Sequence, residues 1–389
     1  MLHNSAAASL SSEHIRSLTE VFSKLTFTEA GMSPAEAGTT LEAICSLLPE
    51  SRTALSARLA SSNGPKFIRC LWSLSPSGLP HLGHTVALRL LAQLSRITGV
   101  HVVILIDDIA AFLQGECSWE LMKPRSVFVE CVVSSAFRAL GGDASHMTIL
   151  HGSDFKFEGA YMLDLYRLVS LVPEQDAAQF SGISAASLTG DDDASGATAA
   201  PGAGLSALIL PCTDMLDTVH IRADIRLASP ATSEQRRLFA EKFLTVFDST
   251  AKPAAFVGHP LLPCLAAASA ASEATTTSSV GPMCSFTPPA RDPRLAKSPS
   301  AQAAAKTAAD QCAPLIEPPA PGLALQPLPG LKRRLKQAFC EPGNVANNPV
   351  LDILNAVILP DVGPTGRLLV LSGGEGWPPL SFGLCVSPC

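Results

Sequence analysis

The chain has 389 residues, of which 47% are apolar, so it can bury a sizeable core and has room for one large domain with appendages. Charged residues make up only 16%, and 31 prolines together with long Ala, Ser and Thr stretches predict that part of the chain is not packed. The net charge of −6 excludes a global basic field that would draw the protein onto nucleic acid, so any RNA contact needs a local basic patch.

The eleven cysteines include no CxxC pair and are scattered through apolar segments, which indicates reduced thiols rather than disulfides or a zinc site. No metal site formed by the protein's own side chains is expected. No segment reaches the roughly 18 consecutive apolar residues that a membrane span needs, and Glu13 and Glu20 argue against a secretory signal. The sequence predicts a cytoplasmic protein that is not attached to a membrane.

The first part of the chain predicts helices followed by an alternating α/β pattern. Residues 12 to 60 have helical spacing, which indicates an N-terminal helical extension over residues 1–63. We then expect strands at 67–74, 100–108 and 146–154, with helices at 84–97, 119–140 and 166–172. Alternating apolar strands and amphipathic helices are typical of an α/β fold with a Rossmann-type doubly wound parallel sheet and helices on both faces.

Two segments break this pattern. Residues 173–204 and 264–322 are dominated by small, polar and proline residues, which bury too little apolar surface to offset the entropy of ordering, so both are expected to be disordered insertions. Between them we expect a helix at 205–221, a strand at 222–228 and a helix at 232–247 capped by Thr232 or Ser233. The Rossmann-type domain is thus predicted to cover residues 64–263.

After the second insertion, the sequence predicts a basic helix at 331–339 and a helix at 349–359 that opens with Pro349. The remaining tail is rich in Gly and Pro and too short for another helical domain. Residues 323–389 are therefore expected to form a C-terminal helical segment with a short tail.

The clearest chemical signal is the segment PSGLPHLGH at residues 76–84, between the first strand and the first helix of the sheet. A helix N-terminus offers unpaired N–H groups and a positive dipole end, which suits a polyphosphate. Two histidines three residues apart can donate hydrogen bonds to phosphate oxygens as negative charge develops on them. The predicted ATP-binding residues are Pro76, Ser77, Gly78, His81, Gly83 and His84.

An HxGH motif at this place resembles the nucleotidyl-transferring superfamily that includes class I aminoacyl-tRNA synthetases. Four further segments resemble the archaeal and eukaryotic tyrosyl-tRNA synthetases, in the same order: SWELMKPRSVFVECVVSSAFRALG, HGSDFKFEGAYMLDLYRLVSLV, SEQRRLFAEKF and KQAFCEPGNVANNPVLDI. The resemblance covers about half of the chain, over residues 64–172, 205–247 and 331–378. It implies activation of tyrosine by ATP, with Mg²⁺, to tyrosyl-adenylate and transfer of the acyl group to tRNA.

The resemblance also implies roles for individual residues. Asp217 stands where the family has the carboxylate that accepts a hydrogen bond from the substrate phenol, and Gln235 matches a substrate-holding glutamine. Asp214 replaces a family glutamine and could pair with the substrate ammonium. Lys297, followed by Ser298, stands where the family has its catalytic lysine loop. His81 and His84 are the other expected catalytic residues.

Several positions depart from the family pattern. Leu71 and Leu210 replace tyrosines of the substrate site, Ala110 replaces a histidine, and the helical anticodon-binding region expected after Trp377 is missing. Two other functions therefore stay open: a non-catalytic paralogue that binds nucleotide, RNA or a partner protein, and another HxGH nucleotidyltransferase. The family usually forms homodimers, so tyrosine, tRNA and a second copy of the chain are the expected partners.

Overall fold

The computed structural model describes residues 34–59, 67–77, 80–115, 117–181, 205–249, 251, 253–263, 282–283, 349–358, 369–370 and 380–381. Gly78, Lys297, the basic segment 331–339 and almost all of the predicted insertion 264–322 lie outside these residues.

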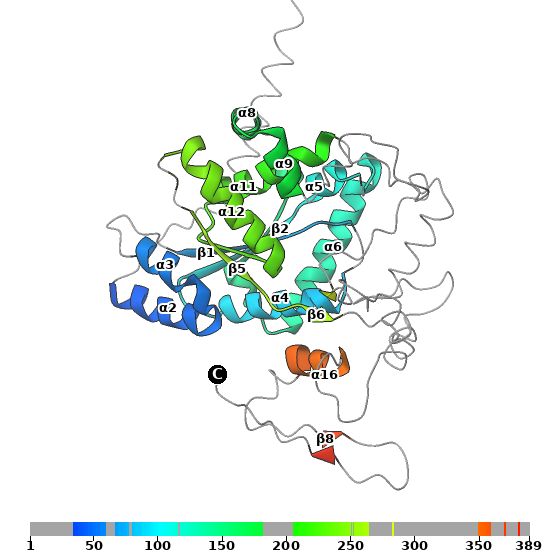
Figure 1. Ribbon diagram of the computed structural model, residues 1–389. Helices are drawn as coiled ribbons and strands as arrows, with labels where there is room; N and C mark the ends of the chain where they lie inside the picture. Colours follow the sequence, from blue (N-terminus) through cyan, green and yellow to red (C-terminus); the bar gives the residue numbers. More distant parts are fainter. Residues whose placement is uncertain are drawn as a thin grey trace, which may run out of the picture.

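The centre of the molecule is a five-stranded, all-parallel sheet in the order β3-β2-β1-β4-β5 (Figure 1). Its strands are β1 (Ile68–Leu74), β2 (Val100–Ile106), β3 (Met147–His151), β4 (Ile225–Ala228) and β5 (Ala255–Gly258). β1 pairs with β2 along its whole length, from Ile68 opposite Val100 to Leu74 opposite Ile106. This arrangement confirms the predicted Rossmann-type sheet. The fifth strand, β5, was not predicted.

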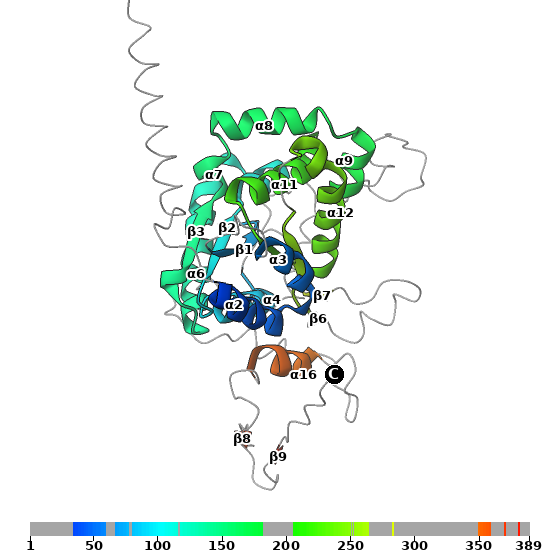
Figure 2. The ribbon, with the colours of Figure 1, turned by 90° about the vertical axis from the view of Figure 1, so that its left-hand side faces the viewer.

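Helices cover both faces of the sheet (Figures 1 and 2). The helices before the third strand are α2 (Pro34–Leu47), α3 (Arg52–Leu59), α4 (Leu82–Leu94), α5 (Asp108–Leu113) and α6 (Trp119–Ala139). Those after it are α7 (Gly152–Phe155), α8 (Gly159–Val169), α9 (Glu174–Ser181), α11 (Leu210–Ile221) and α12 (Pro230–Phe247). Short 3₁₀ turns lie at Pro49–Ser51, Ala144–His146 and Leu205–Ile209.

Two apolar cores follow from the alternation of side chains along the strands. On one face, Ile68, Cys70, Trp72 and Leu74 of β1 pack against buried residues of α4 and α6 and against Ile44, Leu48 and Leu55 from the N-terminal helices. On the other face, Leu71, Val103 and Leu105 pack against α8, α11 and α12. The predicted N-terminal extension is therefore helical where it is described, and its apolar side chains complete the first core.

The C-terminal helix α16 (Pro349–Ile353) continues as a π-helical turn, Leu354–Ile358, and lies beside α4 (Figure 1). Arg89 of α4 donates a hydrogen bond of 2.8 Å to the carbonyl oxygen of Val357. The predicted helix at 349–359 is thus present and held against the first core. Four short strands complete the described chain in two antiparallel pairs: β6 (Leu262–Pro263) with β7 (Pro282–Met283), and β8 (Leu369–Val370) with β9 (Leu380–Ser381).

Two predictions were wrong in detail. The insertion predicted at 173–204 does not begin at residue 173, because residues 174–181 form α9, with Ala177 and Ala178 buried and the Phe180 ring 5.2 Å from that of Phe239. The helix predicted from residue 232 begins at Pro230, and its N-cap is Ser229, whose side chain accepts a hydrogen bond from the Thr232 amide. Proline fits the first helical position because it needs no N–H partner there.

Candidate functional site

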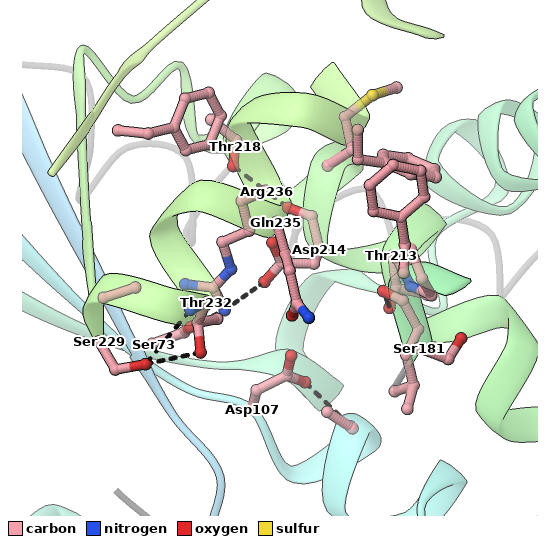
Figure 3. Close-up of a pocket in the computed structure, with 18 of the residues that line it drawn as sticks. Ser73, Asp107, Ser181, Thr213, Asp214, Thr218, Ser229, Thr232, Gln235 and Arg236 are labelled. Atoms are coloured by element: carbon pink, nitrogen blue, oxygen red, sulfur yellow. Dashed lines mark hydrogen bonds and ion pairs between the residues drawn. The ribbon is translucent and has the colours of Figure 1, made fainter. Parts of the chain in front are cut away.

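A cavity of about 200 Å³ opens at the carboxyl ends of the strands, between β1 and β4. At this point the strand order reverses: β2 and β3 were added on one side of β1, and β4 and β5 follow on the other. The lining of the cavity comes from the ends of β1, β2 and β4 and from α9, α11 and α12. Figure 3 shows lining side chains that include Ser73, Asp107 and Ser181. Ligands of doubly wound sheets bind at this point because helix and strand ends leave a crevice there. The cavity is therefore the candidate substrate site.

His81 and His84 begin α4, the helix that follows β1. His81 is the N-cap: its Nδ1 accepts a hydrogen bond of 3.1 Å from the Gly83 amide, and the Nδ1 of His84 accepts one of 2.9 Å from the His81 amide. Both side chains are buried, and their ring centroids are 4.0 Å apart. Because both Nδ1 atoms are acceptors, each neutral ring carries its proton on Nε2 and can donate from that atom.

The other described residues predicted to bind ATP lie around this helix start. Pro76 and Ser77 are buried in the turn after β1, and Gly83 is buried in the first turn of α4. The two histidines do not line the cavity, but Trp72 does, and its ring centroid lies 6.2 Å from that of His84. The helix start and the cavity are thus neighbouring features that share the end of β1.

Asp217 lies on α11 and is fully buried, so it is not on a solvent-facing side of the helix. Its Oδ1 accepts a hydrogen bond of 2.9 Å from the phenol of Tyr161, and its Oδ2 accepts one of 2.9 Å from Lys156 Nζ. Asp217 is not among the residues that line the cavity. In this structure, both oxygens of the carboxylate that was expected to accept the substrate phenol already accept hydrogen bonds from Tyr161 and Lys156 of the chain itself.

Lys156 links this carboxylate to the end of β2. Its Nζ lies 2.8 Å from both carboxylate oxygens of Asp107, which caps α5 and lines the cavity. Burial raises the pKa of Asp217 to about 7, with a further increase from Asp107, while the charge on Lys156 opposes both. Burial alone would lower the pKa of Lys156, but the two carboxylates outweigh it and raise that pKa. The ammonium therefore stays charged.

Asp214, one turn before Asp217, faces two arginines. The guanidinium of Arg226 lies 2.6 Å from Asp214 Oδ1, and that of Arg236 lies 2.7 Å from the same oxygen. Burial would raise the pKa of Asp214, but the two guanidinium charges lower it, so the carboxylate is ionised. Figure 3 shows Asp214 and Arg236 side by side in the cavity wall. The acidic group expected to face a substrate ammonium is already paired with two cations.

The remaining positions considered from the sequence fall around the same cavity. Gln235 of α12 is exposed and lines it, as do Ala110 and Leu210, whereas Leu71 is fully buried in the second apolar core. Sequence reasoning missed Lys156, Tyr161 and Arg226. A signal existed for Arg226, because an arginine between Ile225 and Leu227 in a strand covered on both faces must be buried.

Comparisons with known proteins agree with this geometry. Residues 63–228 match the family model of class I tRNA synthetases for tryptophan and tyrosine. The cytoplasmic tyrosine–tRNA ligase of Xenopus laevis is 25% identical over 296 residues, which cover 75% of this chain and 44% of that protein. The corresponding ligase of Saccharomyces cerevisiae is 23% identical, with 76% of this chain and 60% of that protein covered. The chain therefore matches about half the length of these relatives.

Solved structures are similar in fold. The tyrosyl-tRNA synthetase of Archaeoglobus fulgidus, complexed with L-tyrosine, superposes with a TM-score of 0.59 at 20% identity, over 89% of this chain and 87% of that one. The enzyme of Pyrococcus horikoshii gives the same TM-score at 15% identity, with 88% and 86% covered. The matched segment is thus similar to class I tRNA synthetases for tryptophan and tyrosine, and the described fold is that of solved tyrosyl-tRNA synthetases.

Proposed function

We propose that the protein is an ATP-dependent amino-acid ligase of the tyrosyl type, which forms an aminoacyl-adenylate and passes the acyl group to tRNA. The observation that carries this proposal is the cavity at the carboxyl ends of β1, β2 and β4, beside a helix start formed by two histidines. Tyrosine is the proposed amino acid because the relatives named above are tyrosine–tRNA ligases.

In the proposed reaction, the substrate carboxylate attacks the α-phosphorus of ATP, and pyrophosphate leaves with the electron pair of the broken P–O bond. The phosphates would lie against the N-terminus of α4, beside the turn at Pro76 and Ser77. His81 and His84 would donate from Nε2 to phosphate oxygens as negative charge grows. Gly83 keeps the helix start free of a side chain where the nucleotide approaches.

Mg²⁺ is proposed to enter with ATP rather than to occupy a protein site. Among the described residues, no group of three or more His, Cys, Asp or Glu side chains could hold a metal ion. Mg²⁺ keeps several waters and binds readily to substrate phosphates, and when bound it would neutralise part of the phosphate charge.

The histidines serve as helix caps in the structure, so a test must separate this structural role from nucleotide binding. Asn at an N-cap and Gln three residues later preserve capping hydrogen bonds. The variant His81→Asn/His84→Gln should therefore fold like the wild type, yet lose about 100-fold or more in ATP–pyrophosphate exchange, since a positioned donor contributes about that factor. The measurement is exchange at saturating amino acid, alongside a thermal melt.

The variant His81→Ala/His84→Ala is the comparison, because it removes both the caps and the imidazole donors. If the capped variant keeps full exchange, the histidines act only as caps and ATP binds elsewhere. If both variants unfold at the same lower temperature, Asn and Gln do not preserve the caps, and each histidine is then replaced singly in the same assay. Unchanged exchange in both folded single variants would also reject the ATP site.

We further propose that the protein acts in the cytoplasm as a homodimer. The names of the relatives above include the cytoplasm, and no helix in the described part of the chain has the length and apolar character of a membrane span. Phe112, Trp119 and Phe157 form a cluster of aromatic rings, with centroid distances of 5.2 and 6.0 Å and 40–52% exposure. Such an exposed apolar cluster supports a protein contact at this surface.

A further inference from the structure

Two arginines meet in the wall of the substrate cavity. Arg226 projects from β4 and is fully buried, while Arg236 projects from α12 and lines the cavity. The Nη2 atoms of both also lie near the Ser73 hydroxyl of β1, at 2.9 and 3.2 Å. Figure 3 shows Ser73, Asp214 and Arg236 converging at one side of the cavity. β1, β4, α11 and α12 thus contribute to one polar cluster, the arginine corner.

The arginine corner has two positive charges and one negative charge. Asp214 is the carboxylate bound by both guanidinium groups, and both use the same oxygen, Oδ1. The Nε and Nη1 atoms of Arg226 are buried and have no hydrogen-bond acceptor among the described residues. Buried guanidinium groups are normally fully paired, because removing their hydration is unfavourable unless acceptors replace the water. The corner therefore lacks a second anion.

The opposite wall of the cavity has the reverse balance. There, Asp107 lines the cavity, and it shares the single ammonium of Lys156 with Asp217. The cavity is therefore polar along its length, with a cationic side at Arg236 and an acidic side at Asp107. A ligand that carries a negative charge is attracted to the first side, and a positive charge is repelled from it.

The protonation of the arginines agrees with this arrangement. Burial lowers the pKa of Arg236 to about 10, Asp214 opposes that decrease, and the neighbouring charge on Arg226 adds to it. The Arg236 guanidinium is therefore still charged near neutral pH. An anion in the cavity would offset the repulsion between the two guanidinium groups and would accept hydrogen bonds from Arg236, the arginine that lines the cavity.

We propose that Arg236, backed by Arg226, forms an anion subsite in the cavity that binds a carboxylate of the amino-acid substrate. The proposal rests on the proposed function only in taking an amino acid as the ligand. It reverses the expectation from the sequence, in which Asp214 was to pair with the substrate ammonium. The carboxylate is either the α-carboxylate or an acidic side chain, and the two sources require different ligands.

The direct test compares two probes that share the phenol ring and differ in charge. 3-(4-Hydroxyphenyl)propionate has the carboxylate without the ammonium, and tyramine has the ammonium without the carboxylate. In titration calorimetry of the full chain, the acid should bind at least tenfold more tightly than tyramine. L-Glutamate and L-aspartate are titrated in parallel: tight binding of either identifies a side-chain carboxylate as the source, and preference for the phenolic acid identifies the α-carboxylate.

The variant Arg236→Gln should weaken binding of the best acidic ligand at least tenfold and leave tyramine unchanged or tighter. Arg237→Gln is the matched control, because Arg237 is the next residue on α12 and pairs with Glu234 and Glu241 away from the cavity. Arg226→Met should produce a smaller loss of acid binding. Because Arg226 is buried, its variant is compared only where circular dichroism shows a folded protein, and Arg236→Gln decides the outcome.

The subsite is rejected if tyramine binds as tightly as the acid, if none of the acidic ligands binds, or if Arg236→Gln binds the acid like the wild type. These outcomes do not depend on catalysis, since no ATP is present. A protein that exchanges pyrophosphate with tyrosine but fails these titrations is a ligase without the anion subsite. A protein that binds the acid through Arg236 without exchange has the subsite, and then the proposed ligase function is wrong.

Discussion

At the residue scale, the site is dominated by buried and half-buried charges, most of which are paired with one another. Asp217 shares Lys156 with Asp107, and Asp214 shares two arginines. Removing one member of such a pair leaves an uncompensated buried charge, which is far more destabilising than losing a surface pair. These side chains therefore contribute to the stability of the sheet ends as well as to any substrate preference.

Asp217 should make stability depend on pH. Its pKa is raised from 3.8 to about 7 in the folded protein, mainly by burial, so the folded state holds a proton that the unfolded chain releases. The stabilising contribution is present at low pH and is lost as pH rises through 7. Between pH 5 and 7.5 the wild type should lose this contribution, whereas Asp217→Asn has no carboxyl group to titrate. The difference between their free energies of unfolding, measured in urea, should therefore shift in favour of Asp217→Asn by roughly 1–2 kcal/mol.

Glu241→Gln is the control for this pH series, because Glu241 is an exposed carboxylate on α12 that pairs with Arg237. Its difference from the wild type should stay constant between pH 5 and 7.5. The prediction fails if the stability difference between the wild type and Asp217→Asn is also constant over this pH range, or if it shifts in favour of the wild type as pH rises. Either result would show that Asp217 is ionised throughout and that the charge on Lys156 outweighs the effect of burial.

The sequence could identify individual residues of the site but not their partners. Asp214, Asp217 and Gln235 were indicated by resemblance, and the structure brings Asp214 and Gln235 to one cavity. Lys156 and Tyr161, however, reach Asp217 from positions 61 and 56 residues away in the chain. These contacts depend on the packing of α8 against α11, and no local pattern encodes them.

At the scale of secondary structure, strands and helices with clear periodicity were predicted well, and short or irregular ones were not. The strong apolar runs of β1 and β2 and the long helix α6 were recognisable in the sequence. β5 has only four residues, Ala255–Gly258, and exists because it pairs with β4. α9 was missed because its eight residues are largely polar or small, and its order comes from packing on α11 and α12.

The end of α11 contains a strained residue that can be improved. Arg222 has a φ of 56° and is the one non-glycine residue with positive φ in the described part of the chain. The left-handed conformation costs a non-glycine residue about 1–2 kcal/mol, and glycine loses about 0.5–1 kcal/mol more entropy on folding. Arg222→Gly should therefore stabilise the protein by about 0.5–1 kcal/mol, measured by urea unfolding.

Arg222→Ala is the control, since it removes the side chain and its charge but keeps the backbone strain. It should fall below the glycine variant in stability. Burial lowers the pKa of Arg69, Asp224 raises it, and the charge on Arg222 lowers it further. An alanine variant as stable as the glycine variant would mean that the gain comes from removing this repulsion between Arg222 and Arg69.

At the scale of the whole molecule, the parallel sheet positions the helix start and the cavity side by side. The aromatic cluster on α5, α6 and the segment after α7 is left exposed. If this surface forms the proposed homodimer, Trp119→Ser should shift the molar mass in solution from dimer to monomer at micromolar concentration. Trp119 is 52% exposed and contacts both other rings, so it is the central residue of the cluster.

Light scattering coupled to size-exclusion chromatography measures this change. Val246→Ser is the matched control, because Val246 is 65% exposed on α12, away from the cluster. It should leave the molar mass unchanged. A wild-type protein that is monomeric at these concentrations, or a dimer that persists in Trp119→Ser, would remove the aromatic cluster from the account of assembly.

In the proposed function, the cavity and the neighbouring histidine-capped helix together activate an amino acid with ATP. The most direct measurement is ATP–pyrophosphate exchange by the full chain with each of the twenty amino acids supplied in turn. We expect exchange that depends on an added amino acid, with tyrosine the first candidate, and loss of this exchange in His81→Asn/His84→Gln. Absence of exchange with every amino acid, in a protein shown to be folded, would contradict the proposed function.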